Sequence, residues 1–339
     1  MLNTSSNPNT VRIGIDVGGT KINAVTLAGR EIVARLRVPT PRTSHELIQS
    51  VSEVARTLRL DVPVPATVSN RAHADATVAH GVPVGVGIAG MVDRQGRIIH
   101  SPNLVWMDGV DVAAELKAAT GFDVNVENDA NAAVFAEWRI GAGVGVQNLT
   151  MVSIGTGIGG GIIADGHLLT GATGFAGEIG HMPVTADGPV CICGGAGHWE
   201  AIASGPALGA LVDRAFELGQ LDRSAATLAR PPRPSDLADL ARQHRDEVQP
   251  IVEDFGSAVA RGLEGLIAIL DPAVIVLGGG VMDLGQMLLD AVQQSLEQRV
   301  EGGPMRVLPE LRLAKIGSDA AAVGAALLCD DVATGEEGS

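Results

Sequence analysis

The sequence predicts an α/β protein built from two similar halves. Two glycine-rich turns, DVGGTK at 16–21 and GTGIGGG at 155–161, each follow a short apolar run rich in β-branched residues. Such runs are typical of buried strands. Helical periodicity is found at 130 to about 140, 207–218 and 248–270. Strands that alternate with helices favour an α/β fold, and two turns of similar design suggest a duplicated fold with one phosphate loop from each half.

The first glycine turn lies inside a predicted β-hairpin. Residues 11–15 form one strand and residues 22–27 a second, so the glycines occupy a turn and not the start of a helix. Dinucleotide fingerprints and Walker loops differ, because they need a strand followed by a helix. Glycines let backbone N–H groups approach phosphate oxygens closely, and Asp16 at the strand end could orient Mg²⁺ or a metal-bound water. An ordinary glycine turn with an aspartate at its edge fits the same residues.

The second glycine turn repeats this design. Residues 149–154 are strand-like and precede the glycines, and a further strand is expected at 162–164. We therefore expect a second hairpin whose turn contains the glycines of residues 155–161.

Asp129 is expected at the N-terminus of a helix. Residues 122–126 read as a strand, and the motif ENDAN leads from it into a helical pattern that begins at Ala130. Aspartate and asparagine are preferred helix caps, so a capping role is one interpretation of Asp129. A rigid strand end also suits a general base, whose position must be tightly fixed. Both roles are compatible.

Four ligand-type residues gather in one glycine-rich segment: His181, Cys191, Cys193 and His198. The chain has three cysteines, and two of them lie here. Thiolates and imidazoles at this spacing favour a tetrahedral structural Zn²⁺ site, although scattered ligand-type residues remain the alternative. Glu178 and Glu200 flank the cluster, and a metal that closes the loop would hold both carboxylates rigidly enough to bind sugar hydroxyls.

The chain carries seven motifs in order: DVGGTK, SPNLVW, ENDANAA, IGTGIGGG, GEIGHMPV, CICGGAGHWE and VIVLGGG. Together they resemble the ROK family (repressors, uncharacterised reading frames and kinases), and within it the bacterial glucokinases. The resemblance spans residues 11 to about 328. It implies an actin-like ATPase (ribonuclease H-like) fold with two lobes and a central cleft. It also implies an ATP-dependent kinase that phosphorylates a hexose, glucose first of all, at the 6-hydroxyl.

Site residues follow from the same resemblance. It implies that Asp129 is the catalytic base that takes the proton of the sugar hydroxyl. It implies sugar binding by Asn103, Asn128, Asp129, Glu178, His181 and Glu200, with His181 binding zinc through one ring nitrogen and sugar through the other. It implies ATP binding, with Mg²⁺, by Asp16, Gly18, Gly19, Thr20, Lys21, Gly155, Thr156, Gly157, Gly278 and Gly279.

One position departs from the family pattern. The zinc loop of the family reads C-x-C-G-x-x-G-C-x-E, and the third cysteine is His198 in this chain. Two cysteines and two histidines are a good zinc set, so we expect retained zinc with altered affinity. Loss of zinc is the alternative, and it would leave the loop less rigid.

Charge and hydropathy bear on partners and location. The net charge of −15 argues against nucleic-acid and anionic-membrane partners. Family repressors carry a helix-turn-helix module before the first glycine loop, and only ten residues stand there, so DNA binding is not expected. No apolar stretch suits a membrane span or a signal peptide, so a cytoplasmic location is expected. By analogy with the family we expect a homodimer or homotetramer, with residues 248–270 as a candidate dimer surface.

The expected domains are a small lobe, residues 1–122 plus about 318–331, with the first phosphate loop, and a large lobe, residues 123–317. The large lobe would hold the catalytic aspartate, the second phosphate loop, the zinc loop and the adenosine side. Prolines predict loops at 61–83 and 230–234, and residues 332–339 form a tail.

The substrate stays open within this resemblance. N-acetylmannosamine, mannose, fructose and allose are alternatives to glucose, and polyphosphate is an alternative donor that would favour a more basic channel. A sugar-sensing regulator without catalysis is the alternative from another class. Asp129 and both glycine loops favour the enzyme, because a sensor does not need them.

Overall fold

The computed structural model describes residues 10–60, 82–221, 234–242 and 244–333. The chain divides into two compact units, each with its own sheet and its own hydrophobic core. Unit 1 comprises Met1–Val144, Leu168–Ala176 and Ser318–Ser339, and unit 2 comprises Gly145–His167 and Gly177–Gly317. Of the loops and tail expected from the sequence, residues 61–81, 230–233 and 334–339 lie outside the described residues.

Unit 1 contains a five-stranded sheet in the order β3-β2-β1-β4-β7. Its strands are β1 (Val11–Val17), β2 (Lys21–Ala28), β3 (Glu31–Pro39), β4 (Val84–Ile88) and β7 (Val124–Asn128). The first three are antiparallel, and β4 and β7 continue the sheet in parallel with β1. The short strands β5 (Met91–Val92) and β6 (Ile98–His100) form a separate pair.

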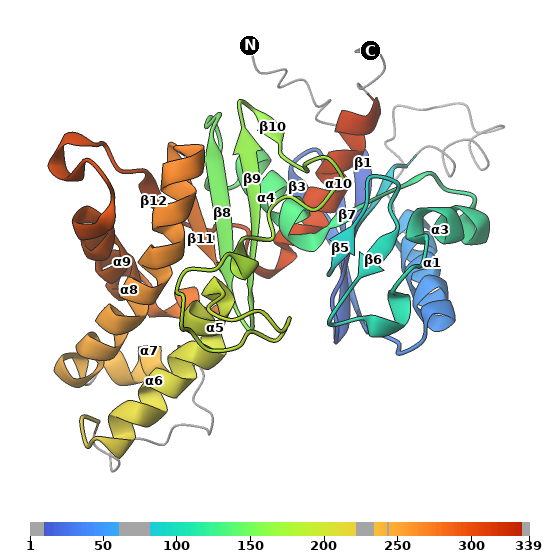
Figure 1. Cartoon of the computed structure of the whole chain (residues 1–339). Helices are drawn as coiled ribbons and strands as arrows, with labels where there is room; N and C mark the ends of the chain where they lie inside the picture. The colour runs from blue at the N-terminus through green and yellow to red at the C-terminus, as the bar shows by residue number, and fades with distance from the viewer. Residues whose placement is uncertain (1–9, 61–81, 222–233, 243, 334–339) are drawn as a thin grey trace. The chain divides into compact units, whose positions relative to one another are not determined.

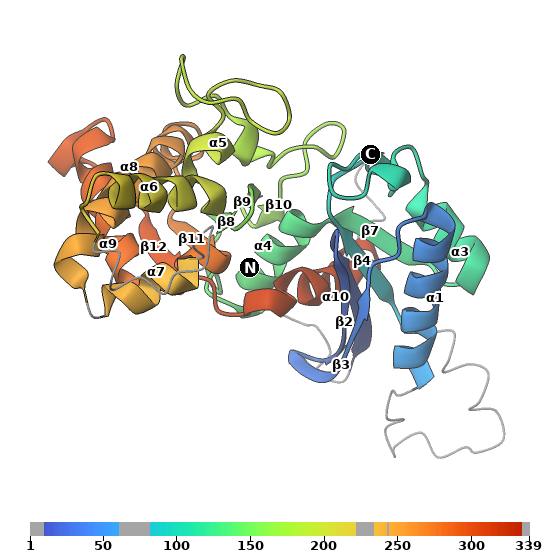
Figure 2. The same ribbon diagram turned by 90° about the horizontal axis from the view of Figure 1, so that it is seen from below.

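Helices cover both faces of this sheet. The two on one face are α1 (Ser44–Leu60) and α3 (Val112–Thr120), and the two on the other are α4 (Asp129–Ile140) and α10 (Ala320–Ala333), as Figures 1 and 2 show. Side chains alternate along β1, so Ile13, Ile15 and Val17 enter the core with α1. The intervening Gly14 lies against α10.

Unit 2 contains a second five-stranded sheet, in the order β10-β9-β8-β11-β12. Its strands are β8 (Leu149–Ile154), β9 (Ile158–Ala164), β10 (His167–Leu168), β11 (Val274–Gly278) and β12 (Glu310–Leu313). Its helices are α5 (Trp199–Ala203), α6 (Gly205–Glu217), α7 (Pro234–Ala241), α8 (Arg245–Leu270) and α9 (Gln286–Arg299). Short 3-10 turns occur in unit 1 at Val105–Met107, in unit 2 at Ile179–His181, Gly280–Leu284 and Gly303–Met305, and at the boundary between the units at Gly317–Asp319.

The two sheets repeat one topology, as the paired glycine turns predict. In each, the first strand forms an antiparallel hairpin with the second and pairs in parallel with the fourth. The second hairpin differs in detail from the expectation, because β9 begins at Ile158 and the glycines at 159–161 belong to the strand. The strand expected at 122–126 is observed as β7, Val124–Asn128. Gly121 ends α3 in the left-handed conformation, and residues 122 and 123 connect α3 to this strand.

Contacts place the boundary between the units at Val144, whereas the sequence suggests a boundary near residue 122. Strand β7 pairs with β4, and α4 packs against α10, so both elements belong to unit 1. Asp129, the first residue of α4, therefore lies in the same unit as the first glycine turn.

Helix α10 approaches its neighbours at backbone distance. A Cβ on Gly14 would lie 1.8 Å from the Ala322 carbonyl oxygen, and one on Gly85 would lie 1.9 Å from that of Ala325. A Cβ on Gly324 within α10 would lie 1.6 Å from the Ala132 carbonyl oxygen of α4. Glycine is therefore required at these contacts by space and not by backbone conformation.

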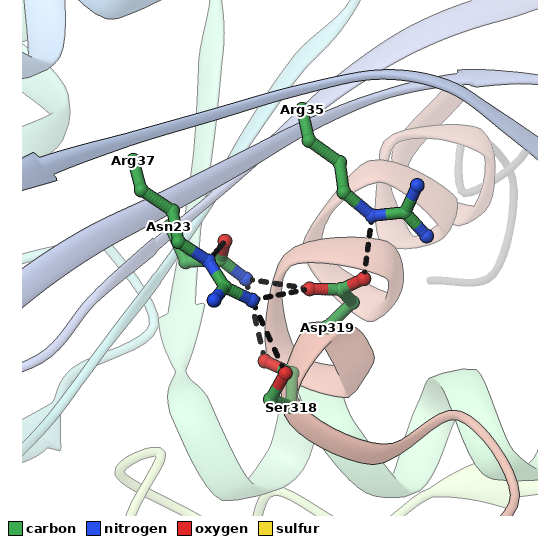
Figure 3. Close-up of polar contacts among 5 residues, drawn as sticks. All are labelled: Asn23, Arg35, Arg37, Ser318 and Asp319. Carbon is green, nitrogen blue, oxygen red and sulfur yellow. Dashed lines mark hydrogen bonds and ion pairs between the residues drawn. The ribbon is translucent and has the colours of Figure 1, made fainter.

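A polar network anchors the start of α10 to β2 and β3 (Figure 3). The Asp319 carboxylate accepts hydrogen bonds from Arg35 Nε at 2.9 Å, Asn23 Nδ2 at 3.1 Å and Arg37 Nη2 at 3.3 Å. Arg37 Nη2 also donates to Ser318 Oγ at 3.2 Å. Partial burial opposes ionisation of Asp319, but the hydrogen bonds from Arg35, Asn23 and Arg37 prevail and lower its pKa.

We expect Gly324→Ala to lower the free energy of unfolding by about 3 kcal/mol, because the added methyl would overlap a backbone carbonyl that cannot move freely. The matched control is Gly265→Ala in α8, where an added Cβ has no neighbour within 4 Å. That control should stabilise the protein by up to about 1 kcal/mol through helix propensity. Urea denaturation of both variants measures the difference, and equal stability would contradict the packing argument.

We expect Asp319→Asn to lower the free energy of unfolding by about 1 kcal/mol at pH 7, since its arginine partners are half exposed. The pKa of Asp319 is lower in the folded state, so its contribution is present above the unfolded pKa and is lost as the pH falls through the folded pKa. The difference from wild type should therefore shrink below about pH 4. If the stability difference between wild type and Asp319→Asn stays constant at acidic pH, the ion pairs of Asp319 do not contribute to stability. The control is Glu310→Gln, which removes an exposed ion pair with Arg312.

Candidate active site

The carboxyl ends of β1, β4 and β7 meet at one edge of the sheet in unit 1. Asp16 of β1 is in register with Gly87 of β4, which is in register with Glu127 of β7. A Cβ on Gly87 would lie 3.6 Å from the Asp129 Cα, so this position of β4 lies against the start of α4. Ligands of open α/β sheets bind at such edges.

Asn128, and not Asp129, caps α4. Asn128 Oδ1 accepts hydrogen bonds from the backbone N–H groups of Ala130 at 2.9 Å and Asn131 at 3.0 Å. Asn128 Nδ2 donates to the Gly90 carbonyl oxygen at 2.9 Å, which leaves its second N–H for a ligand. Asp129 Oδ1 accepts a hydrogen bond from the Ala130 N–H at 2.9 Å, an N–H that the cap Asn128 also binds.

Burial raises the pKa values of both aspartates at this edge. Desolvation raises the pKa of Asp129 and outweighs its backbone hydrogen bonds. Asp16 has its pKa raised to about 7, first by burial and then by the negative charge of Asp129, while the charge of Lys21 opposes the shift. Two carboxylates that repel each other in a buried position are suited to share a proton or a divalent cation.

The first glycine turn is braced from two sides. Gly18 N–H donates to the Lys21 carbonyl oxygen at 3.1 Å, and Thr40 Oγ1 donates to the Gly18 carbonyl oxygen at 2.6 Å. A Cβ on Gly19 would lie 3.1 Å from the Asn103 Cβ, so this glycine lets Asn103 approach the turn. The structure thus brings Asn103 to the first glycine turn.

The second glycine turn lies beside the glycines that follow β11 in unit 2. Gly279 has a φ of 88°, and a Cβ there would lie 2.3 Å from the Ile154 carbonyl oxygen at the end of β8. Gly155 N–H donates to the Gly157 carbonyl oxygen at 2.9 Å, and Gly205 N–H donates to the Gly155 carbonyl oxygen at 2.8 Å. The structure therefore brings together the Gly155–Gly157 turn and Gly278–Gly279.

The four expected metal ligands converge in unit 2. One ligand atom from each of His181, Cys191, Cys193 and His198 lies within 4.8 Å of the other three. Cys193 Sγ lies 3.1 Å from His198 Nδ1, and Cys191 Sγ lies 3.8 Å from His181 Nδ1. Bonds of about 2.0–2.3 Å to one zinc separate its ligands by about 3.3–3.8 Å, so the cluster is consistent with zinc.

The two ring nitrogens of His181 face different groups. Nδ1 points to the cluster, whereas Nε2 lies 4.0 Å from Glu178 Oε2. A metal on Nδ1 would fix the ring and leave Nε2 toward Glu178. This geometry is compatible with the two contacts expected of His181.

Glu200 lies between the cluster and the second glycine turn. Its Oε1 is 3.4 Å from Cys191 Sγ, and its Oε2 accepts a hydrogen bond from Ile158 N–H at 2.9 Å. A Cβ on Gly157 would lie 2.3 Å from Glu200 Oε2. The Glu200 carboxylate therefore lies directly against Gly157, and a side chain at position 157 would have to displace it.

Two residues that sequence reasoning did not assign support the site of unit 1. Glu127 Oε1 accepts hydrogen bonds from Asn128 N–H at 2.9 Å and from Asn131 Nδ2 at 3.1 Å, and burial raises its pKa. Thr40 braces the first glycine turn from the end of β3. The position of Glu127 next to Asn128 could have indicated from the sequence that Glu127 supports the site. No local sequence pattern indicates the role of Thr40.

The expected site residues divide between the units. Unit 1 holds Asp16, Gly18, Gly19, Thr20, Lys21, Asn103, Asn128 and Asp129, and unit 2 holds Gly155, Thr156, Gly157, Glu178, His181, Cys191, Cys193, His198, Glu200, Gly278 and Gly279. Among the described helices, none is both long and apolar enough to cross a membrane.

A family model described as "ROK family" matches residues 12–332, so the chain belongs to the ROK family. It is 32% identical over 332 residues to a glucokinase of Streptomyces coelicolor, covering 93% of this chain and 96% of that protein. It is 28% identical to an N-acetylmannosamine kinase of Haemophilus influenzae, covering 94% of this chain and 95% of that protein.

The fold agrees with that of a solved relative. The crystal structure of a ROK family glucokinase from Streptomyces griseus, in complex with glucose and AMPPNP, is similar with a TM-score of 0.78 and 31% identity. The match covers 95% of this chain and 99% of that chain. It confirms the expected α/β fold of the actin-like ATPase type.

We expect the purified protein to hold one zinc per chain and His198→Ala to weaken zinc binding at least about 100-fold, because one of four ligands is lost. His198→Cys should keep the metal, since a thiolate is an equally good ligand. Metal analysis and chelator competition measure both. The control is His167→Ala, an exposed histidine outside the cluster, and zinc binding that is unchanged in His198→Ala would rule out this ligand set.

Proposed function

We propose that this protein is an ATP-dependent hexose kinase that phosphorylates glucose at the 6-hydroxyl. Membership of the ROK family and the similarity to named glucokinases support a sugar kinase. The solved relative with glucose and AMPPNP supports ATP as the donor. The choice of glucose as the substrate is inferred from these relatives, and not from a bound ligand.

The observation that carries the proposal is the position and environment of Asp129. Its carboxylate stands at the start of a rigid helix, is relieved of capping by Asn128, and has a pKa raised by burial. A raised pKa makes a carboxylate a stronger base, and a base near the working pH is the most effective proton acceptor.

In the proposed mechanism Asp129 accepts the proton of the sugar 6-hydroxyl as the hydroxyl oxygen attacks the γ-phosphorus of ATP. The bond between that phosphorus and the bridging oxygen of the β-phosphate breaks, and ADP leaves. Phosphoryl transfer has a loose transition state, so alignment and charge neutralisation dominate, and the base contributes about 10²- to 10⁴-fold. Mg²⁺ would neutralise charge on the phosphates, with Asp16 as the residue to orient it or its water. Backbone N–H groups of the two glycine turns, at 18–20 and 155–157, would bind phosphate oxygens.

The candidate sugar-binding groups are amides, carboxylates and an imidazole. Asn103 and the free N–H of Asn128 come from unit 1. Glu178, Glu200 and His181 Nε2 come from unit 2, and zinc on His181 Nδ1 would fix the orientation of that ring.

A kinase for N-acetylmannosamine is the second candidate. It is favoured by the similarity to the Haemophilus influenzae enzyme, which extends over 94% of this chain at 28% identity. The same base, donor and zinc loop would serve this reaction, and only the recognition of the sugar around C2 would differ.

We expect Asp129→Asn to reduce kcat by about 10²- to 10⁴-fold and to leave glucose binding nearly intact, because the amide keeps the shape but does not accept the proton. ADP release gives kcat, and calorimetry gives sugar affinity. Asp111→Asn is the matched control, since Asp111 caps α3 by accepting a hydrogen bond from Ala114 N–H at 3.0 Å and asparagine caps equally well. An unchanged kcat in Asp129→Asn would remove the base assignment.

A further inference from the structure

Glu200 contacts both the metal cluster and the second glycine turn within unit 2. One carboxylate oxygen lies 3.4 Å from Cys191 Sγ, and the other accepts the Ile158 N–H at 2.9 Å. Only Trp199 separates Glu200 from the expected ligand His198 in the sequence. One short segment therefore carries a metal ligand at one end and a support for the glycine turn at the other.

The helix that carries Glu200 is firmly anchored. Trp199 at the start of α5 is fully buried, and its Nε1 donates to the Ala258 carbonyl oxygen in α8 at 3.1 Å. A Cβ on Gly262 would lie 2.1 Å from the Trp199 ring, so the indole packs directly on the backbone of α8. Trp199 N–H also donates to the Met182 carbonyl oxygen at 2.9 Å, next to the ligand His181.

The glycine turn rests on this segment at several points. Gly157 lies against the Glu200 carboxylate, and Ile158 N–H donates to it. Gly205 N–H, at the start of α6, donates to the Gly155 carbonyl oxygen at 2.8 Å. A shift of residues 198–205 would therefore move the Gly155–Gly157 turn.

We propose that Glu200 is a positioning residue through which occupation of the zinc cluster sets the affinity of the second glycine turn for nucleotide phosphate. His198 and Cys191 would hold the metal together with His181 and Cys193, and this would fix the segment that carries Glu200. Glu200 in turn holds the 155–158 backbone in the shape that binds phosphate. This inference rests on the proposed function, because it takes the Gly155–Gly157 turn as a nucleotide site.

Such coupling is reciprocal. If zinc strengthens nucleotide binding by some factor, nucleotide strengthens zinc binding by the same factor. A carboxylate that only stabilised the fold would not link the two affinities. The reciprocal effect therefore distinguishes a positioning role from a structural one.

The test measures binding of Mg–AMPPNP by calorimetry without sugar, in zinc-loaded and chelator-treated wild type, Glu200→Ala and Glu200→Gln. We expect zinc removal to weaken binding to wild type about tenfold, within the usual range of such couplings. Glu200→Ala should bind Mg–AMPPNP weakly even when it is loaded with zinc. Its affinity for Mg–AMPPNP should not change when zinc is removed. Glu200→Gln keeps an oxygen that accepts the Ile158 N–H, so it should keep most of the coupling.

A second measurement uses folded, zinc-loaded protein alone. Chelator competition is run with and without Mg–AMPPNP. In wild type the nucleotide should raise the affinity for zinc about tenfold. In Glu200→Ala the affinity for zinc should be the same with and without nucleotide. This measurement tests the coupling between zinc and nucleotide even if removal of zinc unfolds the protein. Zinc affinity independent of nucleotide in wild type, or full coupling in Glu200→Ala, would overturn the inference. Absence of Mg–AMPPNP binding to zinc-loaded wild type would overturn the proposed function, and the inference with it.

Discussion

The backbone contact of α10 with β1, β4 and α4 is the constraint on which the site of unit 1 depends. Three glycines, Gly14, Gly85 and Gly324, allow it, because a Cβ at any of them would overlap a carbonyl oxygen. The contact joins the C-terminal helix to the N-terminal sheet and fixes the start of α4 beside the end of β4. Asp319, at the entrance to α10, then ties β2 and β3 to the same helix.

Two partly buried carboxylates lie at this sheet edge, in the unit that contains α10. Asp16 and Asp129 are partly buried, and desolvation is the largest cause of both raised pKa values. The resulting free energy is unfavourable for folding, as is usual where a site stores strain or charge for its function. Asn128 caps α4 and Asp129 is the proposed base, so in this proposal adjacent residues of one motif divide two roles.

Much of this arrangement could be predicted from local patterns. The duplicated hairpins, the long helices and the convergence of His181, Cys191, Cys193 and His198 follow from periodicity and spacing, and the structure contains them. The glycines at 159–161 were expected in a turn but lie in β9, because ladder pairing with β8 overrides the turn preference of glycine.

Contacts between distant segments gave no local signal. Glu200 against Gly157, and Gly14 against α10, are set by packing between residues far apart in the chain. Sequence periodicity reports which face of an element is buried, but it does not report the partner. The sequence pattern gave capping as one interpretation of Asp129, whereas in the structure Asn128 caps α4 and the helix begins at Asp129.

The most direct test of the account is ADP release by zinc-loaded protein with ATP, Mg²⁺ and a panel of sugars that includes glucose and N-acetylmannosamine. We expect ATP-dependent turnover with kcat/KM highest for glucose. Highest turnover with N-acetylmannosamine would keep the mechanism and change the substrate. Saturable sugar binding without ADP release from any sugar would contradict the central claim that Asp129 serves as the base of a kinase.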